Sequence, residues 1–184
     1  IVNHGFSTRL GGVSTGCFSS MNISLTRGDD PEAVKKNREP IAQAIGVEVA
    51  DFTYTQQTHT TNVKRVYAKE KGQSFPETDG MITDVPGICL VTSYADCVPL
   101  YFVDPVKKVI GLSHSGWRGT VGKIGKVTVE KMEEEFGCDP ADILGAVGPS
   151  ICQDCYEVSE DVIKKFCENY DENLWPEIFY QKEN

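Results

Sequence analysis

Apolar residues recur at helical spacing in the first third of the chain. Asp29-Asp30-Pro31-Glu32 has the acidic cap and the first-turn proline of a helix start, and Gly46 marks the expected end. Between them, Val34, Ile41 and Ile45 give the helix an apolar face. Pro40 lies inside this stretch, so we expect the helix to kink or break there.

The middle of the chain changes to short runs of apolar and β-branched residues, separated by Pro, Gly and Asp. Such runs predict strands. The predicted strands cover residues 52–56, 63–67, 80–83, 88–93, 100–103 and 109–112. Asp104-Pro105 separates the last two and predicts a hairpin, whereas Asp79-Gly80 is interpreted as a turn.

Helical spacing returns over residues 120–136, ahead of a stop at Gly137, and again after Ser159. Residues 144–147, between these two helices, are predicted to form a strand. The sequence contains no internal repeat, low-complexity tract or linker. We therefore predict a single α/β domain over residues 1–184.

Composition narrows the classes of partner. The 184 residues are 40% hydrophobic, which is enough for a sizeable core. A formal net charge of −9 without a Lys/Arg-rich block argues against nucleic acid or an anionic membrane, since neutralising phosphates needs concentrated positive charge. No apolar run approaches the roughly 18 to 20 residues of a membrane span. The chain opens at Ile1 and not at a methionine, so a leader ahead of it stays an open question.

Three metal-binding side chains stand at predicted strand-to-loop junctions: His59, Cys97 and His114. They are too far apart in sequence to form a local zinc finger, so only the fold could bring them together. Three protein ligands around Zn²⁺ leave a fourth position for water or substrate, which is the pattern of a catalytic zinc. Cu²⁺ is an alternative ion, because two histidines and one cysteine can also hold copper.

Seven cysteines in a chain of this length do not resemble the dense, even framework of a small secreted domain, which favours a reduced, cytoplasmic setting. Cys152 and Cys155 have C-x-x-C spacing but follow Gly148-Pro149 and do not open a helix, so a metal or redox role for them stays open. The remaining cysteines are interpreted as small buried hydrophobic residues: Cys17, Cys89, Cys138 and Cys167.

Six segments, in order along nearly the whole chain, resemble the YfiH-like family, also called the polyphenol oxidase or laccase-domain family. They are His4-Gly-Phe-Ser-Thr-Arg-Leu-Gly-Gly-Val-Ser, Gln57-Thr-His, Thr78-Asp-Gly-Met-Ile-Thr, Ala95-Asp-Cys-Val-Pro, His114-Ser-Gly-Trp-Arg-Gly-Thr, and Gly148-Pro-Ser-Ile followed by Cys155-Tyr-Glu-Val. The resemblance implies an α/β (α+β) fold with mixed sheets flanked by helices, shared with a bacterial toxin deamidase (CNF toxin). It also implies that His59, Cys97 and His114 bind a catalytic zinc. The family usually continues past the equivalent of Tyr170 with a further helix, a strand and an Arg-rich tail, so we expect this domain to lack its C-terminal segment.

Members of the family are described as purine nucleoside phosphorylases. The resemblance therefore implies that inorganic phosphate cleaves adenosine, inosine, guanosine or methylthioadenosine to free base and sugar 1-phosphate, and that adenosine is also deaminated. Arg118 and the amides of residues 116–120 are expected to hold the phosphate, and Arg9 could supply a second guanidinium. Salt bridges with the acidic surface are the alternative role of both arginines. Asp96, beside Cys97, is a candidate for moving a proton.

Four further residues are candidates for contacting the nucleoside. Asn22 and Gln57 could hydrogen-bond it, although satisfying loop backbone is their alternative role. Trp117 and Tyr156 could stack on the purine, although packing into the core is equally open to them.

Three other classes of function compete with the phosphorylase. A cysteine hydrolase or deamidase would use Cys97 as nucleophile and His114 as base, without metal. A copper-dependent phenol oxidase of the multicopper type needs many more histidines than the three in this chain. A non-catalytic, metal-stabilised binding module would leave the open coordination position and Arg118 without a use.

Overall fold

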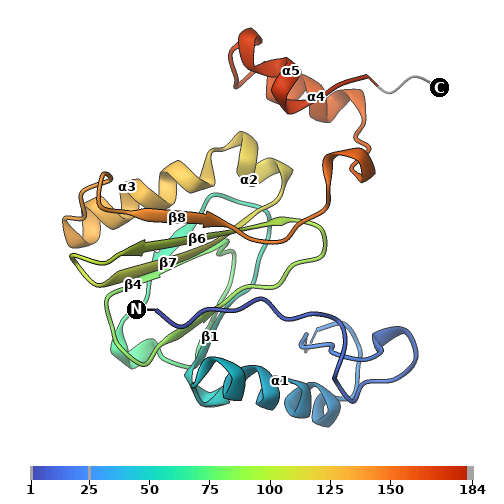
Figure 1. The fold of residues 1–184 in the computed structure, drawn as a ribbon, viewed down its shortest axis with the longest axis vertical. Helices are drawn as coiled ribbons and strands as arrows, with labels where there is room; N and C mark the ends of the chain where they lie inside the picture. Colours follow the sequence, from blue (N-terminus) through green and yellow to red (C-terminus); the bar gives the residue numbers. More distant parts are fainter. Residues whose placement is uncertain (1, 25, 182–184) are drawn as a thin grey trace.

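The computed structural model describes residues 2–24 and 26–181, which contain two sheets and the helices around them (Figure 1). The larger sheet has five strands in the order β2-β4-β7-β6-β8. Their bounds are β2 Val63–Arg65, β4 Gly80–Thr83, β7 Val109–Ser115, β6 Val98–Asp104 and β8 Leu144–Val147. β2 and β4 run parallel and the other pairs antiparallel, so this sheet is mixed.

The smaller sheet has three parallel strands in the order β3-β1-β5. Their bounds are β3 Ser74–Phe75, β1 Phe52–Thr55 and β5 Cys89–Val91. A buried cluster of Val66, Phe75, Met81 and Ile88 joins the two sheets, because Phe75 comes from β3 and Met81 from β4. Packing across this cluster fixes where the loop after β1 lies relative to the larger sheet.

The described residues also form five α-helices. Their bounds are α1 Pro31–Ile45, α2 Trp117–Val121, α3 Ile124–Phe136, α4 Glu160–Cys167 and α5 Trp175–Ile178. Short 3₁₀ turns cover Gly16–Phe18, Val49–Asp51, Ala68–Glu70, Gln153–Cys155 and Glu172–Leu174. In Figure 1, α3 lies along one face of the larger sheet, α1 lies at the opposite side of the molecule, and α4 and α5 project beyond α2.

The second buried cluster lies where α3 covers the larger sheet. It consists of Ile82, Val109, Met132 and Cys138. Gly111 in β7 allows α3 to pack closely on the strand, since a Cβ at this position would lie only 3.3 Å from the side chains of Ile82 and Thr128. β7, which carries His114 near its end, is therefore held between its neighbouring strands and the helix above it.

The α/β class, the mixed sheets and the predicted strands are confirmed, with three corrections to local structure. Of the kink or break expected at Pro40, a break does not occur: α1 continues through Pro40, and the carbonyl of the exposed Lys36, which loses its helical donor, can bind water. The helix predicted over 120–136 begins earlier and is split into α2 and α3, because Lys123 takes a left-handed conformation with φ 58°. The two-residue strand β3 was not predicted, since so short a run has no periodicity.

The interpretation of four cysteines as buried hydrophobic residues is correct for Cys138 and wrong for Cys17, which is exposed; Cys89 and Cys167 are partly buried. Cys17 lies on an exposed 3₁₀ turn, where no apolar neighbours cover it. Among the described residues, no helix combines the length and the apolar composition needed to cross a membrane.

Candidate metal centre

Three donor atoms from three separate segments meet at one end of the larger sheet. His59 lies in the loop between β1 and β2, Cys97 immediately precedes β6, and His114 is near the end of β7. Their ligand atoms all lie within 4.8 Å of one another, and Cys97 Sγ is 4.0 Å from His59 Nε2. The two imidazole rings are 4.9 Å apart and nearly perpendicular, so each can direct a nitrogen to a common point.

Strand register brings Cys97 and His114 together. In the antiparallel pair of β6 and β7, Val98 lies opposite Ser115 and Pro99 opposite His114. Cys97, one residue before this pairing starts, is therefore next to the end of β7. On the other side of β7, Gly80 of β4 lies opposite Ser113, which places Asp79 beside His114.

Asp79 holds the two histidine segments together, and sequence reasoning missed it by treating Asp79-Gly80 as a turn. Its side chain is completely buried. The carboxylate accepts the N–H groups of Thr58, His59 and Thr60 at 3.2, 3.1 and 2.8 Å, and the Thr60 hydroxyl at 2.8 Å. Nδ1 of His114 lies 2.9 Å from Oδ1 of Asp79. The available signal was an acidic residue directly before the wholly buried strand β4, where a charge must find partners.

These contacts determine the ionisation of Asp79 and the tautomer of His114. Burial opposes ionisation of Asp79, but the N–H donors, the Thr60 hydroxyl and His114 outweigh it and lower the pKa of the carboxyl. An ionised carboxylate can only accept hydrogen bonds, so the proton of the neutral His114 ring lies on Nδ1. Nε2 therefore keeps its lone pair free for a metal ion. Burial also lowers the pKa of His114 despite the nearby Asp79, which favours the neutral imidazole that binds metals.

Gly116 leaves the space in which the three donors meet. A Cβ at this position would lie 2.7 Å from Cδ2 of His59, closer than real side chains allow, and 3.2 Å from Sγ of Cys97, which is a tight contact. The backbone is also unusual at two neighbouring points, because His59 and Asp96 have left-handed φ values of 61° and 76°. A glycine and two left-handed residues at one point show that the loops are shaped to bring these donors together.

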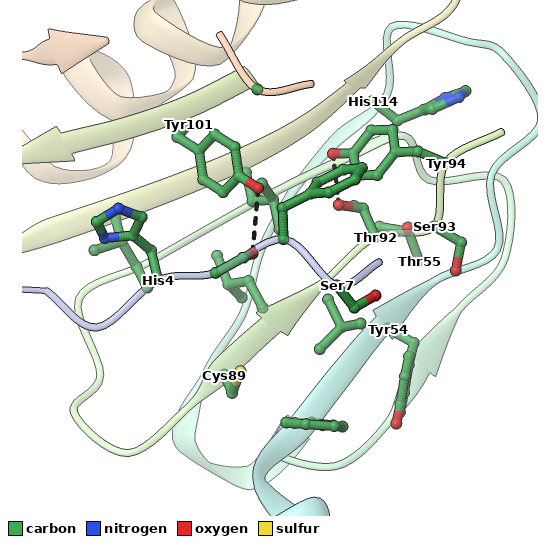
Figure 2. A pocket seen from close by; sticks show the side chains of 18 of the residues that line it. His4, Ser7, Tyr54, Thr55, Cys89, Thr92, Ser93, Tyr94, Tyr101 and His114 are labelled. Carbon is green, nitrogen blue, oxygen red and sulfur yellow. Dashed lines mark hydrogen bonds between the residues drawn. The ribbon is translucent and has the colours of Figure 1, made fainter. Parts of the chain in front are cut away.

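The donors border a cavity of about 1850 Å³ between the two sheets. Figure 2 shows its lining, with His114 and Tyr94 at one end and Tyr101 and His4 at the other. The Tyr94 ring lies 5.6 Å from the His114 ring, and its hydroxyl donates to the carbonyl of Ser113. The cavity is larger than the roughly 300 to 1,000 Å³ of most small-molecule sites, so its size admits a nucleoside.

Three of the predicted substrate-binding residues line this cavity: Arg9, Asn22 and Gln57. The side-chain amide of Gln57 donates a hydrogen bond to the carbonyl of Ser93 at 2.7 Å and accepts one from the N–H of Ser93 at 2.8 Å. The Asn22 amide donates to Asp29 at 2.9 Å and also bonds Ser24. Both amides therefore hold loops in place, whereas the exposed Arg9 contributes its carbonyl to the N–H groups of residues 20 and 21.

The other predicted residues lie outside the cavity lining, although Asp96, Trp117 and Arg118 are close to the donors in sequence. The Arg118 guanidinium lies 4.3 Å from the centre of the Trp117 ring. The hydrogen bond from the Ser159 hydroxyl is the main cause that lowers the pKa of Asp161 in α4, and the charge of Arg118 adds to it. Asp96 is exposed, and its carbonyl accepts the N–H of Ile151. Tyr156 is also exposed; partial burial and the nearby Cys97 and Asp96 raise the pKa of its phenol.

Comparison with known proteins connects this arrangement to enzymes of nucleoside metabolism. The chain is 46% identical over 165 residues to a purine nucleoside phosphorylase of Deinococcus radiodurans, covering 90% of this chain and 63% of that protein. It is 36% identical over 169 residues to the adenosine deaminase RL5 of an unknown prokaryotic organism, covering 88% of this chain and 64% of that protein. The chain thus spans less than two thirds of the length of these relatives.

The fold has a solved counterpart in the crystal structure of the Bacillus licheniformis hypothetical protein YfiH. The two superpose with a TM-score of 0.88 at 32% identity, covering 94% of this chain and 67% of that one. The profile of a family described as "Multi-copper polyphenol oxidoreductase laccase" matches residues 3–184. The chain therefore belongs to this laccase-domain, YfiH-like family.

Proposed function

We propose that this chain is the catalytic part of a zinc-dependent purine nucleoside phosphorylase that also deaminates adenosine. The observation that carries the proposal is the convergence of His59, Cys97 and His114 beside a cavity that admits a nucleoside. The names of the relatives supply the reaction class, since phosphorylases and an adenosine deaminase are among them. The substrates would be adenosine, inosine, guanosine or methylthioadenosine together with inorganic phosphate.

The residues present fit a metal ion. Two neutral imidazoles and a thiolate form a donor set for Zn²⁺, and the space left by Gly116 is where such an ion would lie. Cu²⁺ suits the same donors. A multicopper oxidase centre would need further donor groups, however, and in residues 2–24 and 26–181 this is the one group of three or more donors. His4, the third histidine, instead packs against Tyr101. When bound, zinc would supply Lewis acidity and a water of lowered pKa.

Burial and the neighbouring Asp96 and Asp79 raise the pKa of the Cys97 thiol, so its ionisation needs a compensating positive charge. A divalent cation is such a charge. We expect freshly purified protein to contain about one zinc per chain. Cys97→Ala should remove most of it, and Cys17→Ala, at an exposed cysteine away from the site, should not. Elemental analysis that finds a full equivalent in Cys97→Ala would contradict the ligand set.

The residues around the donors have separate tasks in the proposed reactions. Asp79 fixes the ring of His114 and the loop of His59. The exposed carboxylate of Asp96 would take up or deliver a proton beside Cys97. In phosphorolysis, an oxygen of phosphate bonds to the anomeric carbon while the bond to the purine breaks and its electron pair leaves with the base.

Arg118 is the proposed phosphate ligand. It lies four residues after His114, in the first turn of α2, and among the salt bridges between described residues none involves its guanidinium. Thr120 donates the first helical hydrogen bond of α2, to Gly116, so the amides before it are also available to an anion. Phosphate would thus approach from the side of α2 while the cavity holds the nucleoside.

The dependence on phosphate tests the proposal. With adenosine as substrate, phosphorolysis gives adenine and ribose 1-phosphate, and deamination gives inosine. We expect adenine release to saturate with phosphate and to cease without it, while inosine formation continues. Removal of the metal by a chelator should stop both reactions, and added zinc should restore them. Products are separated by chromatography; full activity of the metal-free protein would refute the mechanism.

One contact favours a second candidate, a metal-independent cysteine hydrolase. Cys97, His114 and Asp79 lie in the order of a nucleophile, a base and an orienting acid. The raised pKa of the Cys97 thiol argues against it, because an activated nucleophile has a lowered pKa. Alkylation separates the two functions. A nucleophilic Cys97 would react rapidly in the purified protein, whereas a zinc-bound thiolate should react only after the metal is removed.

A further inference from the structure

Cys152 and Cys155 lie at the two ends of one 3₁₀ turn. The turn covers Gln153–Cys155 with Cys152 as its N-cap, and the N–H of Cys155 donates to the carbonyl of Cys152 at 3.1 Å. In a 3₁₀ turn, side chains three residues apart lie above one another. The hydrogen bond that closes the turn holds Cys152 and Cys155 next to each other, and their two thiols are within hydrogen-bonding reach of one another.

Both cysteines are exposed, so small reagents can reach them. The two thiols also differ in acidity. The Cys155 thiol, with the N–H groups of Cys155 and Asp154, lowers the pKa of the Cys152 thiol, while Cys152 raises the pKa of Cys155. A thiol of lowered pKa that is followed by a second thiol of raised pKa has the asymmetry of an attacking and a resolving cysteine.

We propose that Cys152 and Cys155 form a reversible redox pair that exchanges with low-molecular-weight disulfides such as glutathione disulfide. The Cys152 thiolate attacks one sulfur of the small disulfide, whose S–S bond breaks, and a mixed disulfide forms as one small thiolate leaves. The Cys155 thiolate then attacks Sγ of Cys152 and displaces the second. In total, the two cysteine thiols lose two electrons and two protons, and one small disulfide becomes two thiols.

The turn is connected to the candidate metal centre by its backbone. The N–H of Ile151, directly before Cys152, donates to the carbonyl of Asp96 at 3.0 Å, and Asp96 precedes Cys97. On its other side, the hydroxyl of Tyr180 donates to the carboxylate of Asp154 at 2.9 Å. These two contacts anchor the residue before the turn and a residue within it.

The test is the reaction of the reduced, zinc-loaded protein with glutathione disulfide, followed by intact mass and peptide mapping. We expect the wild type to lose about 2 Da, the mass of two hydrogens, with the new disulfide mapping to Cys152 and Cys155. Cys155→Ser lacks the resolving thiol and should accumulate a glutathione adduct of about 305 Da on Cys152. Cys17→Ser, which removes an exposed cysteine without a partner three residues away, should behave as the wild type.

Reduction with dithiothreitol should restore the original mass. A stable glutathione adduct on wild-type Cys152, a disulfide that maps to Cys97 or Cys17, or a reaction no faster than that of Cys17 would each overturn the proposal. The wild-type peptide map gives this answer even if a variant does not fold. Because zinc content and phosphorolysis are not part of the readout, failure of this proposal is distinguishable from failure of the proposed function.

Discussion

Asp79 is the residue on which the geometry of the candidate centre depends most. One buried carboxylate accepts three consecutive N–H groups of the His59 loop and faces Nδ1 of His114. The His59 loop is left-handed at its ligand, a conformation that needs support from its surroundings. An outer carboxylate usually orients one metal-binding histidine, whereas Asp79 orients two candidate ligands, His59 and His114.

Asp79→Asn should lower zinc affinity by about tenfold to a hundredfold, the range for removing a partner that orients a metal ligand. The amide can accept some of the N–H groups, but it holds no charge and its NH₂ group conflicts with those donors. Affinity is measured by competition with a chromophoric chelator. Asp104→Asn is the matched control, because Asp104 is equally buried and accepts N–H groups in a turn that joins β6 to β7. Equal zinc affinity in Asp79→Asn and the wild type would show that Asp79 supports only the fold.

Arg118→Ala should weaken phosphorolysis by roughly tenfold to a thousandfold, equivalent to about 1.4 to 4 kcal/mol. Zinc content should not change, and deamination of adenosine should fall much less, since it needs no phosphate. The measurement is adenine against inosine formation at several phosphate concentrations. Lys36→Ala, which removes an exposed positive charge outside the cavity lining, serves as the control for net charge. Equal loss of both products would mean that Arg118 does not bind phosphate selectively.

At the scale of elements, the centre depends on how β7 passes into α2. Cys97 and His114 meet because β6 and β7 pair up to Val98 and Ser115. Gly116 follows at once and is the N-cap of α2, so the chain turns away within one residue of the site. This early turn is also why the helix begins at Trp117, before the position that hydrophobic spacing predicts.

Gly116→Ala should reduce zinc affinity by roughly tenfold or more, since the ligands must be held within about 0.5 Å of their productive positions. The added Cβ would lie 2.7 Å from His59, which has to move. Gly125→Ala is the matched control: it adds the same methyl group in α3, where the nearest atom is 3.4 Å away. Thermal unfolding of the metal-free proteins separates a local from a general effect. If Gly116→Ala binds zinc as tightly as Gly125→Ala, the space is not needed for the ion.

At the scale of the whole molecule, ionised carboxylates hold several segments together, and their pKa values are lowered. They belong to Asp29, Asp51, Glu70, Asp79, Asp104 and Glu135. A carboxyl whose pKa is lowered on folding contributes stability above its ordinary pKa and loses it as pH falls through the folded-state value. The lowered pKa values of these carboxyl groups thus predict that acid, and not mild base, removes the stability that they contribute.

The free energy of unfolding of the metal-free protein should begin to decrease below about pH 6.5, because His114 takes up a proton more readily in the unfolded chain, and should decrease more steeply below about pH 4 as the carboxylates are protonated. Urea unfolding followed by circular dichroism at each pH measures it. Asp79→Asn, which cannot ionise at this position, should show a shallower decrease than the wild type. A stability that is constant down to about pH 3 would contradict the role of these carboxylates.

The sequence by itself determined the elements and the donor types. Periodicity and cap residues identified α1 and most strands, and His59, Cys97 and His114 stood out because few side chains bind zinc. Only the tertiary structure decided what these residues contact. Three contacts depend on segments that are far apart in the sequence. They are the hydrogen bonds to the buried Asp79, the close approach of His59 to Gly116, and the hydrogen bond from the Gln57 amide to the Ser93 backbone. Local periodicity reports which face of an element is buried, but not which polar group of a distant segment it meets.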